Sequence, residues 1–412
     1  MTKRIYLKGL KRRASRKLFS LLSLIAIAFL SFLLTSCDPS QAITVEERTF
    51  LNLSLNFLGE YNLPKTEFKD TPVGGFSALT YDRQRDRFYA LSDDRSAFAP
   101  ARFYTLKLIV NPNTTGTLSL EKVKIEDVTF LKNENGETFP KGAIDPEGIA
   151  LSPKGTVFIS SEGDRNLGVA PFIREFDLKT GQQLRSLPIP ERYLPNDNTK
   201  EDQPPRGMQN NLGFESLTVE TGSSLAAATG DPFRLFTATE SALLQDKLPD
   251  TSIQSIRIRL MHYLIGNIAR PMVVTEHLYL LDPAPNGAIR HGLTDLLTVD
   301  TGGHFLTLER SYTLLGGSAK IYQAATSAAT DTSGIATLKG DVSRIDAVQK
   351  KLLADLSELG IYLDNLEGMT FGPRLPDGSQ TLLLVSDNNF NEIQLTQFLL
   401  FRLTGLRWKS LE

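Results

Sequence analysis

The strongest constraint on the fold of this 412-residue chain is a hairpin pattern that recurs four times. Each copy has a run of β-branched and aromatic residues, a turn rich in Gly, Pro, Asp or Ser, and a second such run. The copies span residues 74–95, 145–165, 212–241 and 366–390. Short runs of this kind, separated by turn residues, predict an all-β protein.

The four copies share one arrangement of polar residues. A Ser or Glu beside Gly opens the first run, and an acidic residue closes the second. The opening residues are Ser77, Glu147, Glu215 and Glu367, and the closing residues are Asp93, Glu162, Glu240 and Asp387. Antiparallel partners lie roughly 5 Å apart, so we expect each hairpin to present its opening and closing side chains at one edge.

The spacing of the copies predicts a β-propeller. Ser77 and Glu147 are 70 residues apart, Glu147 and Glu215 are 68 apart, and Glu215 and Glu367 are 152 apart. We therefore expect a degenerate copy at residues 296–312, with His304 in place of the opening Glu and Glu309 to Arg310 at its close. Units of this size cannot bury their own faces, which favours radial repetition around a channel.

A ring of acidic residues around one channel requires a cation. Oxygen ligands in this number favour Ca²⁺, because the chain has one cysteine and four histidines. An acidic residue at a strand end can instead be a turn former that caps backbone amides. Turn chemistry does not explain Glu inside a strand, where its propensity is poor, so Glu147, Glu215 and Glu367 are the strongest candidates. Asp387, Asn388 and Asn389 follow them, and Asp387 and Asn388 are candidate metal ligands.

The N-terminus has the features of an export signal. The first seventeen residues carry eight basic and no acidic side chains, and an apolar run covers residues 18–34. Leu34–Cys37 resembles a lipobox, which implies cleavage before Cys37, its lipidation and an extracytoplasmic, membrane-anchored lipoprotein of the cell envelope. An uncleaved signal anchor is the alternative. We predict a signal peptide at 1–36, a tether at 37–48 and the propeller at 49–412.

Cys37 is the single cysteine, so the exported part has no disulfide and no cysteine nucleophile. The formal net charge is −2, and removal of the eight basic N-terminal side chains leaves about −10 on the remainder. An acidic chain of this kind does not favour nucleic acid as a partner. We expect a monomer that acts on a small molecule.

Eight short segments resemble the phytase-like family, whose members are described as having esterase-like activity and whose architecture is related to calcium-dependent β-propeller phytases. These segments are Gly74–Ser77, Ser92–Arg95, Asp145–Ile149, Ser160–Gly163, Phe214–Leu217, Thr239–Glu240, Leu366–Met369 and Ser386–Phe390. The resemblance implies a six-bladed propeller with a calcium-lined channel.

The resemblance implies metal-assisted hydrolysis of phosphate or other esters, with one carboxylate as general base. The catalytic candidates are Glu147, Glu215 and Glu367, and the substrate-binding candidates are Arg95, Arg165 and His304. A solvated or salt-bridging role is an equal alternative for the two arginines, and a core or surface position is favoured over the channel for His304. No Gly-x-Ser-x-Gly motif supports a serine hydrolase. The alternative is a non-catalytic propeller, stabilised by calcium, that binds a polymer or protein partner.

Three further segments carry predictions. Residues 337–359 have apolar residues at helical spacing, which predicts one inserted amphipathic helix packed on the propeller. Residues 188–208 are rich in Pro, Asn, Asp and Gln, which is typical of a long surface loop. Residues 394–406 predict a last strand that closes the ring with chain around Leu51–Leu58.

Overall fold

The computed structural model describes residues 44–112, 118–196, 204–220, 231–249, 254–267, 269–314 and 316–406. The chain divides into two units, Met1–Arg48 and Thr49–Glu412. The described part of the first unit contains the short helix α2 (Val45–Thr49), whose last residue, Thr49, is assigned to the second unit. The predicted signal peptide and Cys37 lie outside the described residues. Within the described residues, no helix has the length and apolar character needed to cross a membrane.

The described residues of the second unit form five four-stranded antiparallel sheets, here called blades. Blade 1 contains β4 (Phe76–Asp82), β5 (Arg87–Ser92), β6 (Arg102–Pro112) and β7 (Leu118–Phe130). Blade 2 contains β8 (Pro146–Leu151), β9 (Thr156–Ser161), β10 (Phe172–Asp177) and β11 (Gln183–Ser186). Blade 3 contains β12 (Phe214–Glu220), β13 (Phe233–Thr239), β14 (Ile256–Ile265) and β15 (Met272–Leu281). Blade 4 contains β16 (Ala288–Thr298), β17 (His304–Thr313), β18 (Gly316–Ala325) and β19 (Gln349–Asp355). Blade 5 contains β20 (Asn365–Arg374), β21 (Gln380–Asp387), β22 (Thr396–Thr404) and β1 (Ser54–Leu63). A two-stranded sheet, β2 (Glu67–Phe68) and β3 (Thr71–Pro72), and two 3₁₀ turns, η1 (Glu191–Tyr193) and η2 (Leu356–Leu359), complete the elements.

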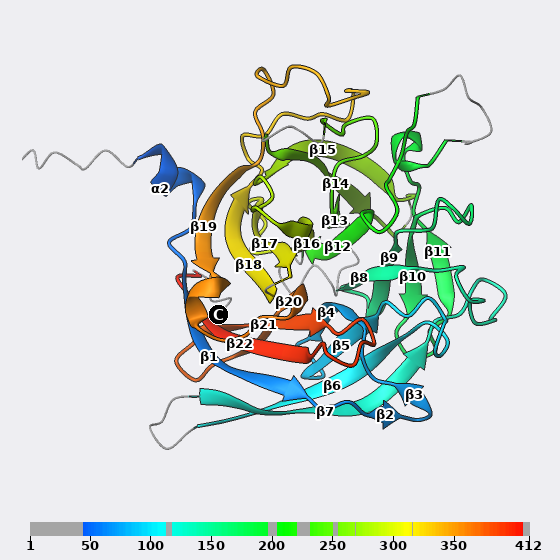
Figure 1. Ribbon diagram of the computed structural model, residues 1–412, viewed down its shortest axis with the longest axis vertical. Coiled ribbons are helices and arrows are strands. Elements are labelled where there is room, and N and C mark those ends of the chain that lie inside the picture. Colours follow the sequence, from blue (N-terminus) through cyan, green and yellow to red (C-terminus); the bar gives the residue numbers. More distant parts are fainter. Residues whose placement is uncertain are drawn as a thin grey trace, which may run out of the picture. The chain divides into compact units, whose positions relative to one another are not determined.

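The blades form a closed ring around one centre, as Figure 1 shows. The inner strands are β4, β8, β12, β16 and β20, and each packs against the next until β20 meets β4. The all-β propeller predicted from the repeat is therefore confirmed. The described residues form five blades, so the six blades implied by the resemblance are wrong. The four copies and the expected degenerate copy correspond to these five blades.

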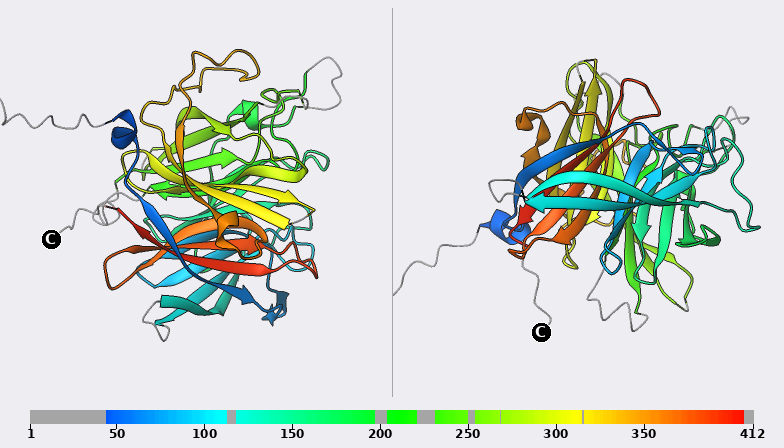
Figure 2. Two further views of the ribbon diagram at one scale, coloured as in Figure 1. Left: turned by 60° about the vertical axis from the view of Figure 1, so that its left-hand side comes forward. Right: turned by 90° about the horizontal axis from the view of Figure 1, so that it is seen from below.

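The ring closes by pairing the two ends of the unit. β1 runs antiparallel to β22, with Ser54 opposite Thr404 and Leu63 opposite Thr396. Figure 2 shows the two strands, blue and red, side by side. The predicted closure by the last strand is therefore confirmed. Because one blade needs both ends of the unit, neither end can leave without opening the ring.

Apolar side chains fill each interface between neighbouring blades. Five hydrophobic clusters are present among the described residues, one for each pair of adjacent sheets. β21 shows how one strand serves two of them: Leu382 and Leu384 pack toward blade 4, whereas Leu383 and Val385 pack toward blade 1. Successive strand residues point to opposite faces, so a strand between two blades is apolar throughout.

The predicted amphipathic helix at residues 337–359 is wrong. Its first part is a loop, and its second part is β19 followed by η2. Tertiary partners take the backbone groups that a helix would pair internally. Arg257 donates to the carbonyl oxygen of Leu338, and the Val348 N–H donates to Leu278 O at 2.8 Å. The predicted loop at 188–208 does connect β11 to β12 and contains no strand among its described residues.

Candidate functional site

The inner strand of every blade contains an irregularity of register at the same position. A β-bulge of this kind bends the strand and redirects a side chain. The residues at the five irregularities are Ser77, Glu147 with Gly148, Glu215, Thr294 and Glu367. The opening residues of the repeat are therefore the bulge residues, which explains how Glu can occupy an inner strand.

The closing residue of each blade follows from the same register. The residue before each bulge pairs with a residue of the second strand. The residue that directly follows this partner in the sequence is the closing residue. Ser92 pairs with Phe76 and precedes Asp93, and Thr239 pairs with Phe214 and precedes Glu240. The five closing residues are Asp93, Glu162, Glu240, Arg310 and Asp387.

Blade 4 differs from the predicted arrangement of opening and closing residues. His304 begins the second strand, β17, and does not stand in the opening position. Thr294 is at the bulge, and Arg310 pairs with Gly292 at the closing position. The degenerate copy exists, but its first strand begins earlier than predicted. Its closing residue is a cation where the other four blades have an acid.

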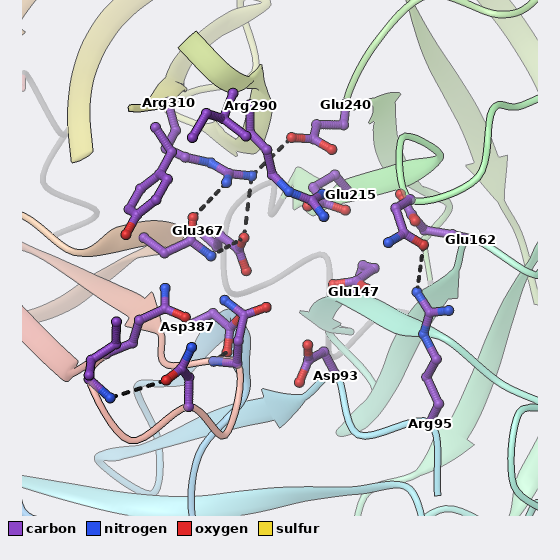
Figure 3. Close-up of a pocket in the computed structure, with 18 residues that line it drawn as sticks. Asp93, Arg95, Glu147, Glu162, Glu215, Glu240, Arg290, Arg310, Glu367 and Asp387 are labelled. Carbon is purple, nitrogen blue, oxygen red and sulfur yellow. Dashed lines mark hydrogen bonds and ion pairs between the residues drawn. The ribbon is translucent and has the colours of Figure 1, made fainter. Parts of the chain in front are cut away.

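The five closing residues and the three bulge glutamates surround a cavity of about 550 Å³ at the centre of the ring, seen in Figure 3. Its lining contains seven carboxylates: Asp93, Glu147, Glu162, Glu215, Glu240, Glu367 and Asp387. It also contains three guanidinium groups, those of Arg95, Arg290 and Arg310. The cavity brings together all the acidic residues that the sequence selected as candidate ligands.

Burial and mutual repulsion hold the protons on these acids. Burial is the main cause, followed by neighbouring carboxylates, of the raised pKa values of Glu147, Glu162 and Glu215. Burial and the charge of Asp387 raise the pKa of Glu367 to about 8, against the attraction of Arg310. Burial raises the pKa of Asp387 to about 6. The cavity therefore resists full ionisation unless a cation enters.

Two groups of carboxylates have the geometry of a metal site. Asp145, Glu147 and Glu162 form one, and Glu162, Glu215 and Glu240 form the other. Within each group, one oxygen of every residue lies within 4.8 Å of the others. Glu162 belongs to both groups, and its Oε1 also accepts a hydrogen bond from the Gly213 N–H.

Arg310 is an internal counter-ion on the other side of the cavity. Its Nη2 lies 2.9 Å from Glu240 Oε1 and 3.3 Å from Glu367 Oε1. Its Nη1 donates to Asn365 Oδ1 at 2.5 Å, and Asn365 Nδ2 donates to Glu367 Oε1 at 2.8 Å. The side chain of Arg310 is 3% exposed, so these charges meet out of contact with bulk water.

Two glycines make room for the acids. Gly75 has φ +62°, and a Cβ there would lie 2.1 Å from Asp93 Oδ1. A Cβ at Gly292 would lie 2.3 Å from Glu240 Cγ. Any larger residue at either position would displace a carboxylate of the cavity.

The remaining candidates divide between the cavity and its surroundings. Arg95 lines the cavity, with Nε 2.6 Å from Asp145 Oδ1 and Nη2 donating to Asn211 Oδ1 at 2.7 Å. Three others do not line it. Arg165 donates to Arg206 O and Asn196 Oδ1, His304 Nδ1 lies 2.8 Å from Asp300 Oδ2, and Asn388 Oδ1 accepts from the Gly75 and Phe390 N–H groups.

Several lining residues were not selected from the sequence. They are Asn211, Ile289, Arg290, Tyr312, Asn365, Asn391, Ile393 and Gln394. The sequence places Arg310 at the close of the degenerate copy but does not identify it as a site residue, and an alignment of blade 4 on its bulge would have done so. Asp145, which contributes to one carboxylate group, directly precedes β8 and reads as an ordinary turn residue.

Comparisons with solved structures give distant similarities. Hydrazine synthase of Kuenenia stuttgartiensis is 9% identical, with 81% of this chain and 62% of that chain covered and a TM-score of 0.29. A GH32 β-fructofuranosidase of Bombyx mori is 10% identical, with 86% and 63% covered and a TM-score of 0.37. The catalytic domain of a GH62 α-L-arabinofuranosidase of Coprinopsis cinerea is 10% identical, with 86% and 97% covered and a TM-score of 0.39. The match spans less than two thirds of the first two proteins.

No curated protein sequence matches the chain. A sequence model of a family does. It covers residues 71–390, which is well over half of the chain and includes all five inner strands with their bulge residues. The chain therefore belongs to the phytase-like family, described as "Esterase-like activity of phytase".

Proposed function

We propose that this chain is a membrane-tethered, extracytoplasmic hydrolase that cleaves phosphate or other esters with the help of Ca²⁺ held by the carboxylates of the cavity. The observation that carries the proposal is the pair of buried carboxylate groups that share Glu162. Family membership supports hydrolysis of an ester as the reaction class.

The residues of the cavity fit a hard cation. Every candidate ligand in the two groups is a carboxylate oxygen, and Ca²⁺ takes six to eight oxygen ligands. Among the described residues, neither Glu147 nor Glu215 forms an ion pair with a basic side chain, and the buried Oδ1 of Asp93 has no hydrogen-bond partner. Such uncompensated negative charge is the condition that a bound cation relieves.

The proposed roles follow from position. Asp145, Glu147, Glu162, Glu215 and Glu240 would hold the metal ions. Bound Ca²⁺ would neutralise charge on the ester and lower the pKa of a bound water. Glu367 belongs to neither carboxylate group, and Figure 3 shows it across the cavity from Glu162. A carboxyl whose pKa is raised to about 8 can hold a proton at neutral pH and pass it to a leaving oxygen.

An assay with and without calcium tests the function. We expect the purified protein to hydrolyse p-nitrophenyl phosphate, p-nitrophenyl acetate or phytate in Ca²⁺ and to lose this turnover in chelator. No calcium-dependent turnover on any of the three would overturn the proposal. Tight calcium binding without turnover would instead favour the non-catalytic propeller that binds a polymer or protein partner.

Calcium should stabilise the protein more at high pH than at low pH. The folded protein holds the protons of Asp145, Asp387 and Glu367 more tightly than the unfolded chain, where the pKa values are 3.8, 3.8 and 4.5. Without metal, this stabilisation is complete below about pH 4 and is lost as the pH rises through about 6 for the aspartates and about 8 for Glu367. We expect the difference in Tm between Ca²⁺ and chelator to grow by about 5 °C between pH 5 and pH 8. Equal differences at the two pH values would contradict the cavity as the calcium site.

The tether proposal has its own test. Cys37→Ala should abolish incorporation of labelled fatty acid, because Cys37 is the single cysteine that could carry the lipid. The variant should keep Met1 to Ser36 and stay at the membrane through their apolar run, so its mass should exceed that of the parent by this segment. A parent protein that takes up no label and already carries Met1 to Ser36 would favour the uncleaved signal anchor.

A further inference from the structure

The mouth of the cavity carries apolar side chains above its charged floor. Ile289, at the start of β16, and Ile393, in the loop between β21 and β22, both line the cavity. Their exposed fractions are 60% and 80%, so neither side chain is needed to fill the core. Tyr312 lines the same cavity. Exposed isoleucines beside a charged pocket are typical of a surface that receives an apolar group.

Two of the three arginines that line the cavity are held by partners among the described residues, and the third is not. Arg310 is held by Glu240 and Glu367, and Arg95 is held by Asp145 and Asn211. Arg290 forms neither an ion pair nor a hydrogen bond with the described residues, and Figure 3 shows its side chain directed into the cavity. Tyr312 is its partner in the β16–β17 register. The cavity thus offers one free guanidinium next to its apolar mouth.

The charge of the lining limits how much anion the cavity can accept. Seven carboxylates outnumber three arginines by four. Two divalent cations, one for each carboxylate group, would bring the lining close to neutral. A ligand with one phosphate can then contact both the metal and Arg290. A ligand with six phosphates would place most of its negative charge next to carboxylates.

We propose that the substrate is a monoester with a single phosphate on an aryl or alkyl group, bound with its phosphate on Arg290 and its apolar group against Ile289 and Ile393. This inference rests on the proposed function and narrows its substrate class. In the reaction, a water oxygen bonds to phosphorus and the bond from phosphorus to the aryl or alkyl oxygen breaks. That oxygen takes one proton, so the products are the alcohol or phenol and inorganic phosphate.

Binding to the calcium-loaded protein tests the inference without reliance on turnover. Calorimetry would compare phenyl phosphate, glycerol 2-phosphate and phytate at a constant concentration of free Ca²⁺. We expect phenyl phosphate to bind about tenfold more tightly than glycerol 2-phosphate. Ile289→Ser combined with Ile393→Ser should remove that advantage, whereas Met272→Ser, at an exposed position on the outer strand of blade 3, should not.

The role of Arg290 is tested separately. Arg290→Gln should weaken binding of both monophosphates about tenfold or more, Arg290→Lys should retain part of the affinity, and calcium affinity should not fall in either. Phytate binding more tightly than phenyl phosphate, or an unchanged preference in the double Ser variant, would overturn the inference. If the ligands bind as expected but no ester is hydrolysed, the proposed function is wrong and the inferred ligand preference is still correct.

Discussion

Glu162→Gln is expected to reduce calcium affinity by about 100-fold or more and to bring ester hydrolysis down to the level seen in chelator. Glu162 is the one residue that belongs to both carboxylate groups, so its loss weakens both sites. Loss of a residue that hydrogen-bonds to a metal ligand lowers metal affinity by about 10–100-fold, and loss of a charged ligand itself should lower it further. The substitution keeps an oxygen that can accept from the Gly213 N–H, so the local backbone should persist.

The same variant should be no less stable than the parent without calcium. Burial and the charges of Asp145 and Glu240 disfavour ionised Glu162, and the amide removes that cost. Isothermal titration with Ca²⁺ and thermal unfolding in chelator measure the two effects. The control is Glu220→Gln, at the far end of β12 from Glu215, where Glu220 lies 3.7 Å from Arg234. Unchanged calcium affinity in Glu162→Gln, or an equal loss in Glu220→Gln, would contradict the shared site.

The fold was predictable because its signals are local. Alternation and turn residues define each hairpin, and the apolar run of β22 needs a partner that only the N-terminal strand can supply. The helix at 337–359 was mispredicted because apolar spacing does not show which groups bind the backbone. The Leu338 N–H donates to the buried Asp246 and its carbonyl accepts from Arg257, so this segment follows the outer face of blade 3 as a loop.

The site was predictable only where the repeat preserves residue type. Glu147, Glu215 and Glu367 are recognisable because three blades place the same acid at the same bulge. In blade 4 the bulge residue is Thr294, so matching by residue type fails at the opening position and selects His304 instead, although Arg310 is placed correctly at the close. Only the register of β16 with β17 identifies Thr294 as the opening residue. Blade 4 thus differs from the others in the property that matters most, the sign of its charge.

That difference has a consequence for stability. Arg310 lies between Glu240 and Glu367, and all three are buried. Removal of one partner from a buried ion pair costs about 3–5 kcal/mol, because it leaves an uncompensated buried charge. Arg310→Gln is therefore expected to destabilise the protein by that amount at pH 8 in chelator, measured by denaturant unfolding.

The loss should depend on pH in a defined direction. Burial raises the pKa of Glu367 to about 8 even with Arg310 present, and the pKa of Glu240 is also raised by burial and held down by Arg310. Without the guanidinium both acids bind protons more readily, so less unpaired negative charge remains as the pH falls and Arg310→Gln should cost less at pH 5 than at pH 8. Addition of Glu240→Gln and Glu367→Gln to the variant should recover part of the loss at pH 8.

Arg402→Gln is the matched control. Arg402 lies 3.6 Å from the half-exposed Asp377, and its substitution should cost less than about 1 kcal/mol. If Arg310→Gln were as mild as this control at pH 8, the central arginine would not be the counter-ion that holds the two acids in the ring.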